Sequence, residues 1–345
     1  MRIKTTIAAL ALTAAIAAPA WAAARRHINI VGSSTVYPFA TSVAERFARS
    51  NPGIRPPVVE STGTGAGMKL FCAGLGERTP DIATASRRMK ASEGALCARN
   101  GVNRITEIQV GLDGIVLAGS TSSPALALTT RDIYAAIAAT PYGRPNRART
   151  WRDVNPRLPN IPIRVIGPPP TSGTRDAIGE LMMTPPCERN AAMAAMKKSN
   201  EARFKQICTG IREDGAFIQA GENDNLIVRK LGATPGTYGL FGYSFLEENS
   251  ATLRGVSING VAPSYATIAN LSYPGARPLF IYIKNQHATA IPGIRQYIAE
   301  FTRESTWGRN GYLVRRGMIA SPDAVRARNA RLASALTPVT LASLR

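Results

Sequence analysis

The segment that decides the fold is HINIVGSST, residues 27–35, together with the amphipathic stretch over residues 38–49. Its first five residues predict a short strand, and the apolar positions of residues 38–49 recur at helical spacing. Pro38 suits the first turn of that helix, and Ser34 or Thr35 suits its N-cap. From residue 27 onward the sequence therefore predicts a strand, a loop of Gly, Ser and Thr, and a helix.

The same junction recurs further along the chain. Strands are predicted over residues 57–61, 81–85 and 163–166. The loops that follow them contain TGTGAG (62–67), SRR (86–88) and TSGTR (171–175), and helices are predicted over 68–72 and 176–183. In α/β sheets such loops gather at the carboxyl ends of the strands, where ligands bind.

These loops share a chemistry that suits an anion. A helix N-terminus carries unpaired backbone N–H groups and a partial positive charge. Glycine lets an anion approach the backbone closely, while Ser and Thr add hydroxyl donors. No Walker loop or dinucleotide fingerprint is complete, because Lys69 is not followed by Ser or Thr and the acidic partner is missing. Each loop alone is typical of helix capping. Together, with one or two Arg, the loops predict a site for a tetrahedral oxyanion.

In the order of its motifs, the chain resembles the periplasmic phosphate-binding proteins of high-affinity phosphate ABC transporters, the Pst type. The matching motifs are VGSSTV (31–36), TGTG (62–65), DI (81–82) with SR (86–87), and TSGTRD (171–176). Further matches lie at residues 113–116, 235–243 and 277–282, so the resemblance covers most of the chain.

The resemblance implies an α/β fold of the two-lobed periplasmic-binding-protein type, a flytrap with mixed sheets flanked by helices and a ligand cleft between the lobes. Lobe one would comprise residues 25–117 and 240–345, and lobe two residues 118–239. Crossing strands near Asp113 and Phe241 would form the hinge.

The resemblance also implies a set of phosphate ligands, carried over by motif. By motif they are Ser34, Thr35 and the N–H of Val36, Thr64, Ser86, Ser172, Gly173 and Thr174. Arg87 and Arg175 are added as ligands because a buried phosphate needs compensating positive charge, and the alternative is that both are ordinary surface charges. Well-known members carry Asp directly after the strand-end Ser, and its carboxylate accepts the proton of hydrogen phosphate. Arg87 stands there in this chain and can only donate.

The basis of selectivity for phosphate over sulfate is therefore open. Asp81, Asp113 and Asp176 are the candidate acceptors. Known members also carry Arg where this chain has Pro168, and Arg175 directly after the loop would supply that cation instead.

Residues 1–24 are predicted to be a cleaved signal peptide. Arg2 and Lys4 form its positive end, residues 5–18 are apolar, and AWA at 20–22 is a small-x-small cleavage pattern. The apolar run is too short to span a bilayer of about 30 Å. We therefore expect an exported, soluble protein of the periplasm.

The four cysteines suit an oxidising compartment, where an even count can pair. Cys72 with Cys97 and Cys187 with Cys208 is the local pairing, one of three that are open. Each pair would close a loop worth about 3 kcal/mol. Metal binding is the alternative, although the chain has no CxxC motif and its two histidines lack ligand spacing.

The composition limits the partner. The chain of 345 residues has a formal charge of +20, which becomes +18 once Arg2 and Lys4 are removed. Its Arg residues are scattered and aromatic residues make up only 6%, which disfavours nucleic acid. The charge alone also suits an anionic membrane surface or a small anion, and the loops described above favour the small anion.

The expected function is that of a solute-binding protein, a monomer that captures inorganic phosphate and delivers it to an ABC transporter permease in the inner membrane. No catalysis, cofactor or metal is expected. The alternatives are a secreted phosphatase built on the same loops, a binding protein for another oxyanion such as sulfate, and a sensor.

Overall fold

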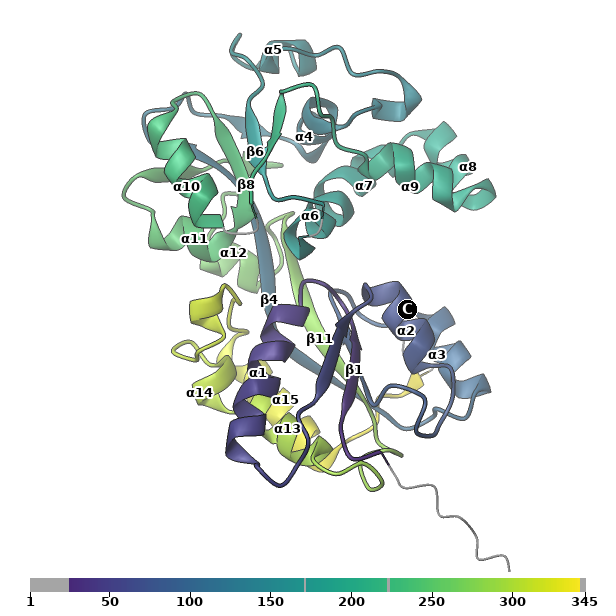
Figure 1. Ribbon diagram of the computed structural model, residues 1–345. Helices are drawn as coiled ribbons and strands as arrows, with labels where there is room; N and C mark the ends of the chain where they lie inside the picture. The colour runs from purple at the N-terminus through teal and green to yellow at the C-terminus, as the bar shows by residue number, and fades with distance from the viewer. Residues whose placement is uncertain (1–24, 171, 222–223, 342–345) are drawn as a thin grey trace, which may run out of the picture.

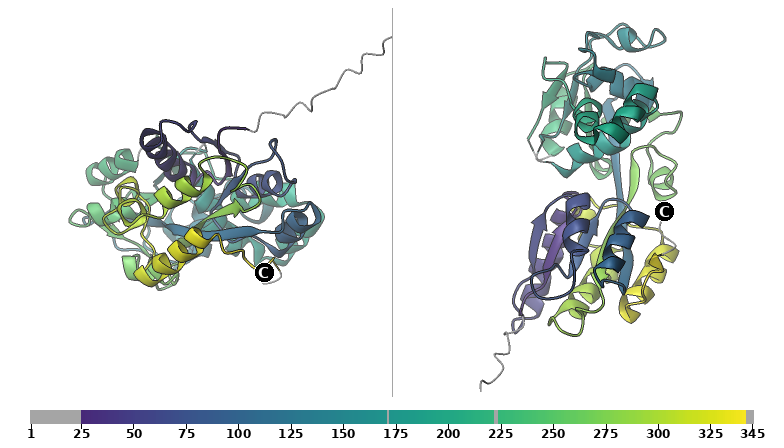
Figure 2. Two further views of the ribbon diagram at one scale, coloured as in Figure 1. Left: turned by 90° about the horizontal axis from the view of Figure 1, so that it is seen from below. Right: turned by 90° about the vertical axis from the view of Figure 1, so that its right-hand side faces the viewer.

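The computed structural model describes residues 25–170, 172–221 and 224–341 and shows two lobes joined by the long strand β4 (Ile105–Ser120) (Figures 1 and 2). The predicted signal peptide, residues 1–24, lies outside the described residues. Among those that are described, none of the helices has the length and apolar character needed to cross a membrane.

Lobe one is built on a sheet in the order β2-β1-β3-β11-β4, in which β1 pairs in parallel with β2 and β3. Its strands are β1 (Asn29–Gly32), β2 (Val58–Ser61), β3 (Ile82–Ala85) and β11 (Ala276–Lys284), with the first half of β4. Its helices are α1 (Tyr37–Ser50), α2 (Thr64–Phe71), α3 (Ala91–Arg99), α13 (Ile294–Phe301), α14 (Glu304–Trp307) and α15 (Asp323–Ala335), with a 3-10 turn at Val314–Arg316.

Both faces of this sheet are buried, and β11 shows why. Leu279, Ile281 and Ile283 belong to a core that α1, α13 and α15 cover, whereas Phe280 and Tyr282 face a second core under α2 and α3. Side chains alternate along a strand, so a continuous apolar run fills both cores. The Gly, Ser and Thr loops lie outside these cores, at the ends of β1, β2 and β3.

Lobe two continues the sheet through the second half of β4, which pairs antiparallel with β8 and β9. Its strands are β6 (Val165–Gly167), β7 (Phe217–Gln219), β8 (Tyr238–Gly242) and β9 (Leu253–Gly255), with a small pair β5 (Ala127–Leu128) and β10 (Ser257–Ile258). Its helices are α4 (Thr130–Ile137), α5 (Trp151–Val154), α6 (Gly173–Ala177), α7 (Thr184–Glu188), α8 (Ala191–Ser199), α9 (Glu201–Thr209), α10 (Asp224–Ala233), α11 (Tyr243–Glu248) and α12 (Tyr265–Ala269). A 3-10 turn at Pro141–Gly143 and a π-helix at Ile178–Met183 complete it.

The chain crosses between the lobes at two places. In β4, Asp113 and Gly114 pair with β11, and from Ile115 onward the strand pairs with β8. The second crossing is at Gly275, where an added Cβ would lie only 2.0 Å from the carbonyl oxygen of Ile115, so the two crossing strands approach as only glycine permits.

The second crossing differs from the predicted boundary at residue 240. Residues 240–275 contribute Leu240, Phe241, Leu253, Ile268 and Tyr273 to the core of lobe two. The reason is that β8 ends at Gly242, after which β9 returns to pair with β4 at residues 118–120. Lobe one is therefore formed by residues 25–114 and 276–341, and lobe two lies within residues 115–275.

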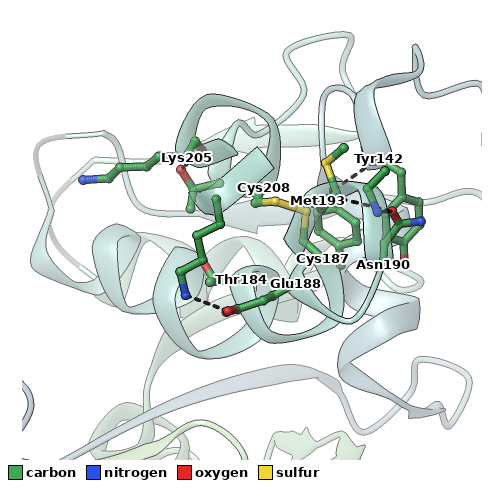
Figure 3. Close-up of a disulfide and its surroundings, with 12 residues drawn as sticks. Tyr142, Thr184, Cys187, Glu188, Asn190, Met193, Lys205 and Cys208 are labelled. Carbon is green, nitrogen blue, oxygen red and sulfur yellow. Dashed lines mark hydrogen bonds and ion pairs between the residues drawn. A yellow bond between two sulfur atoms is a disulfide. The ribbon is translucent and has the colours of Figure 1, made fainter. Parts of the chain in front are cut away.

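The predicted cysteine pairing is confirmed. Cys72 at the end of α2 is bonded to Cys97 in α3, and Cys187 in α7 is bonded to Cys208 in α9 (Figure 3). Each bond joins two neighbouring helices on the outside of a lobe, which fits a structural role.

Candidate functional site

The predicted loops meet where the two lobes face each other. The N-termini of α1 and α2 lie on the side of lobe one that faces lobe two, and α6 lies on the side of lobe two that faces lobe one (Figure 1). Two cavities of about 590 and 620 Å³ lie there, and Ser34 and Thr35 line both. The first cavity is also lined by Ser172, Gly173 and Thr174, and the second by Thr64, Ser86 and Arg175. The structure therefore places most of the predicted ligands around one contact between the lobes.

The loop before α1 directs two hydroxyls at the opposite lobe. The prediction that Ser34 or Thr35 caps α1 is wrong, because Val36 holds the N-cap position and no side chain caps the helix. The hydroxyl of Ser33 accepts the N–H of Val36 at 3.3 Å. Ser34 Oγ instead donates to Asp176 at 2.8 Å, and Thr35 Oγ1 donates to the carbonyl of Gly173 at 3.2 Å. Both hydroxyls are thus held by groups of lobe two.

The start of α2 leaves backbone donors open. The helix begins at Thr64, four residues earlier than the prediction, and no side chain caps it. Gly63 has φ of 76°, a backbone conformation that glycine tolerates, and it turns the chain into the helix. The N–H groups of the first turn therefore have the positions at which helices bind anions.

Thr64 and Ser86 form a buried hydroxyl pair beside α2. Their hydroxyl oxygens are 3.1 Å apart, and the N–H of Ser86 donates to Thr64 Oγ1 at 3.1 Å. One hydroxyl hydrogen is used within the pair, which leaves the other to donate elsewhere. Because both residues line the second cavity, this remaining donor can reach an anion there.

The loop of lobe two touches lobe one through Gly173. Ser172 caps α6 by accepting the N–H of Thr174 at 3.2 Å. A Cβ added at Gly173 would lie 2.7 Å from the backbone nitrogen of Thr35. The missing side chain therefore allows the two lobes to come together at this point.

The two predicted arginines differ in their surroundings. Arg87 binds both carboxylate oxygens of Glu93, at 2.7 and 2.9 Å, and this hydrogen bonding raises the pKa of Arg87. It lines neither cavity. Arg175 lines the second cavity, donates to the carbonyl of Pro168 at 3.1 Å and stacks over the ring of Phe217 at 4.7 Å. Burial lowers the pKa of Arg175.

The three aspartates predicted as candidate proton acceptors lie in different places in the structure. Asp81 is buried away from both cavities, where it binds Arg25 at 2.6 Å and His287 at 2.7 Å. Asp113 lines the first cavity, and Asp176 lines the second, where it holds Ser34. Of these three aspartates, Asp113 and Asp176 are therefore the two placed to meet a ligand in the cleft.

Arg277 was not among the predicted ligands, yet it lies buried directly beneath Thr35. Its guanidinium donates to Thr35 Oγ1 at 2.7 Å, to Asp113 at 3.1 Å and to Glu180 at 2.6 Å. The sequence carries a signal for Arg277, because it is a charged residue at the start of the apolar stretch 276–284. The family resemblance included residues 277–282 as a matching motif but gave Arg277 no role.

Comparison with known proteins agrees with this architecture. Residues 17–305 match the family described as a PBP superfamily domain. Protein SphX of Synechococcus elongatus is 35% identical over 77% of this chain and 70% of its own length. The phosphate-binding protein PstS of Staphylococcus haemolyticus is 28% identical over 85% and 80%. Among solved structures, a possible phosphate binding protein from Planctomyces limnophilus superposes with a TM-score of 0.72 and 27% identity, over 90% of this chain and 98% of that one.

Proposed function

The chain belongs to the PBP superfamily, among the relatives of SphX and PstS, and from this membership we propose that it captures inorganic phosphate between its lobes and presents it to an ABC transporter permease. The observation that carries the proposal is the meeting of Ser34, Thr35, the Thr64–Ser86 pair and the loop of Gly173 around one contact between the lobes. These groups are neutral donors, and a dehydrated tetrahedral oxyanion needs many such donors at once.

The proposed ligands are taken from the sequence motifs, and they differ in how the structure places them relative to the two cavities. Six of its members line the cavities with hydroxyl groups: Ser34, Thr35, Thr64, Ser86, Ser172 and Thr174. Ser34 and Thr35 are bonded to charged groups, Asp176 and Arg277. Gly173 gives the close approach between the lobes, and Arg175 supplies a cation in the second cavity. Val36 and Arg87 become ligands only when their donors leave the hydroxyl of Ser33 and the carboxylate of Glu93.

Asp176 is the proposed acceptor for the proton of hydrogen phosphate. It already accepts a hydrogen bond from Ser34, one of the proposed ligands, and it lines the second cavity. Sulfate carries no proton at neutral pH, so it would place its oxygens against this carboxylate without a hydrogen bond. Selectivity for phosphate over sulfate would then depend on Asp176 of lobe two. It would not depend on position 87, where known members carry Asp and this chain carries Arg.

The proposed setting is the periplasm, with residues 1–24 as the export signal and an inner-membrane permease as the partner. Binding without turnover is the proposed chemistry. Within the described ranges, no group of three or more His, Cys, Asp or Glu could hold a metal ion. The high positive charge would draw anions toward the cleft through a diffuse field, an effect that salt weakens.

Isothermal titration with phosphate, arsenate and sulfate at two pH values tests the proposal. We expect saturable one-to-one binding of phosphate and arsenate, weaker binding of sulfate, and a smaller difference in the variant Asp176→Asn. Ser34→Ala should weaken phosphate binding, whereas the matched control Ser250→Ala, an exposed serine of lobe two, should not. Absence of phosphate binding, or repeated turnover of an aryl phosphate that Ser34→Ala abolishes, would overturn the proposal.

A further inference from the structure

Arg277 lies at the seam between the lobes. It pairs in register with Asp113 where β11 and β4 cross, and its side chain is only 5% exposed. A guanidinium at this depth keeps its charge and has to be matched by anionic or acceptor groups. Its three partners, Thr35, Asp113 and Glu180, come from three different segments of the chain.

The charges around Arg277 do not balance. The guanidinium of Arg277 faces the carboxylates of Asp113 and Glu180, and these two differ in how much they are exposed to water. Asp113 is 13% exposed and belongs to the neighbouring strand, so it is a fixed partner. Glu180 is 53% exposed and reaches Arg277 from the π-helix of lobe two. Moving Glu180 into water therefore costs little, whereas moving Asp113 would disrupt the crossing of the strands.

Arg277 is one hydrogen bond away from the contact between the lobes. It donates to Thr35 Oγ1, and this hydroxyl donates in turn to Gly173. Glu180 lines the same cavity as Thr64, Ser86 and Arg175. Arg277 itself lines neither cavity, so Glu180 connects this buried guanidinium to the wall of the proposed phosphate site.

We propose that Arg277 is a second cation of the site, beside Arg175, that binds the anion directly, and that Glu180 occupies this position on Arg277 until the anion displaces it. The inference rests on the proposed function, and it adds a residue and a competing group to the site. Carboxylate and phosphate are both bidentate partners of a guanidinium, so one replaces the other without leaving the Arg unpaired. Glu180 then turns to solvent, and the repulsion between its charge and the incoming anion is removed.

The test compares phosphate titrations of wild type, Glu180→Gln and Arg277→Gln. Removing the competitor in Glu180→Gln should tighten phosphate binding by about fivefold, the effect of one half-exposed ion pair. Removing the cation in Arg277→Gln should weaken binding by about a hundredfold or more, as for breaking a buried pair. The control is Glu188→Gln, another glutamate of lobe two, which pairs with Lys197 on the surface and should leave the affinity unchanged.

The outcomes separate this inference from the proposed function. If wild type binds none of phosphate, arsenate and sulfate, both are overturned. If wild type binds phosphate but Glu180→Gln binds no more tightly than wild type, the displacement is overturned. If Arg277→Gln is folded by circular dichroism and retains its affinity, the role of Arg277 is overturned. Should Arg277→Gln fail to fold, Glu180→Gln still decides the displacement, and Arg277→Lys, which keeps a charge but loses the bidentate fork, decides the role of the cation by its weaker binding.

Discussion

Replacing Gly173 by alanine tests whether phosphate binding requires the two lobes to touch. The added Cβ would lie 2.7 Å from the backbone nitrogen of Thr35 and 2.8 Å from the carbonyl carbon of Ser34. These atoms belong to the backbone of lobe one and cannot turn aside as a flexible side chain would. The lobes must therefore separate by roughly 0.7 Å to reach an ordinary contact distance of about 3.4 Å.

The size of the effect follows from the cost of overpacking. An added methyl group in a tight contact costs about 1–3 kcal/mol. If this cost falls on the closed, phosphate-bound form, the affinity drops by about fivefold to 150-fold. We expect the stability of the ligand-free protein to change little, because each lobe keeps its own core and the lobes would separate slightly to relieve the contact.

Isothermal titration measures the affinity for phosphate, and thermal unfolding with and without phosphate measures how much the ligand stabilises the protein. The control is Gly232→Ala in α10 of lobe two, where an added Cβ meets nothing within 4 Å. Gly173→Ala should lose affinity and part of the stabilisation by phosphate, while Gly232→Ala should lose neither. Wild-type affinity in Gly173→Ala would refute the claim that this contact closes on the ligand.

Three further predictions concern stability. Replacing Cys72 and Cys97 by serine opens a loop of 25 residues and should lower the free energy of unfolding by about 3 kcal/mol in urea titrations; an unchanged midpoint would contradict this. Burial lowers the pKa of Lys284 from 10.5 to about 8, so its charge penalises the folded state below pH 8. The stability of wild type relative to Lys284→Met should therefore rise from pH 8 to 10.5, and a constant difference would count against it. The hydrogen bond from Arg212 lowers the pKa of Asp214 from 3.8 to about 2. Asp214→Asn should thus be less stable than wild type at pH 5 and approach it near pH 2, and a gap that persists at pH 2 would exclude this origin.

The local parts of this structure could be predicted from the sequence. A strand, a loop of Gly, Ser and Thr and a helix are all encoded within about twenty consecutive residues, so α1 and β1 lie close to their predicted bounds. The disulfides were accessible for the same reason, because each joins cysteines that are near in sequence.

The boundary between the lobes could not be predicted in the same way. The strand pattern of β8 shows that a strand exists, but it does not show on which lobe α11, β9 and α12 pack after it. That choice depends on the pairing of β9 with the far end of β4, more than 130 residues earlier in the chain. The motif near Phe241 therefore predicted the strand β8, but it did not predict where the chain returns from lobe two to lobe one.

The charged groups of the site were the hardest to place. Glu180 lies 97 residues before Arg277, and their contact exists only because the two lobes meet. Arg87 follows a strand-end Ser as a ligand would, yet Glu93 at the start of α3 engages it instead. Residue type and motif position identify groups that can bind an anion, whereas the pairing of those groups depends on the tertiary structure.

A crystal structure of the phosphate complex would show directly whether the anion binds between the lobes. We predict a single phosphate between the lobes, within hydrogen-bonding distance of Ser34, Thr35 and the Thr64–Ser86 pair, with Glu180 released from Arg277. Phosphate bound only to exposed arginines, or a cleft that stays empty at saturating phosphate while Glu180 keeps its contact, would contradict it.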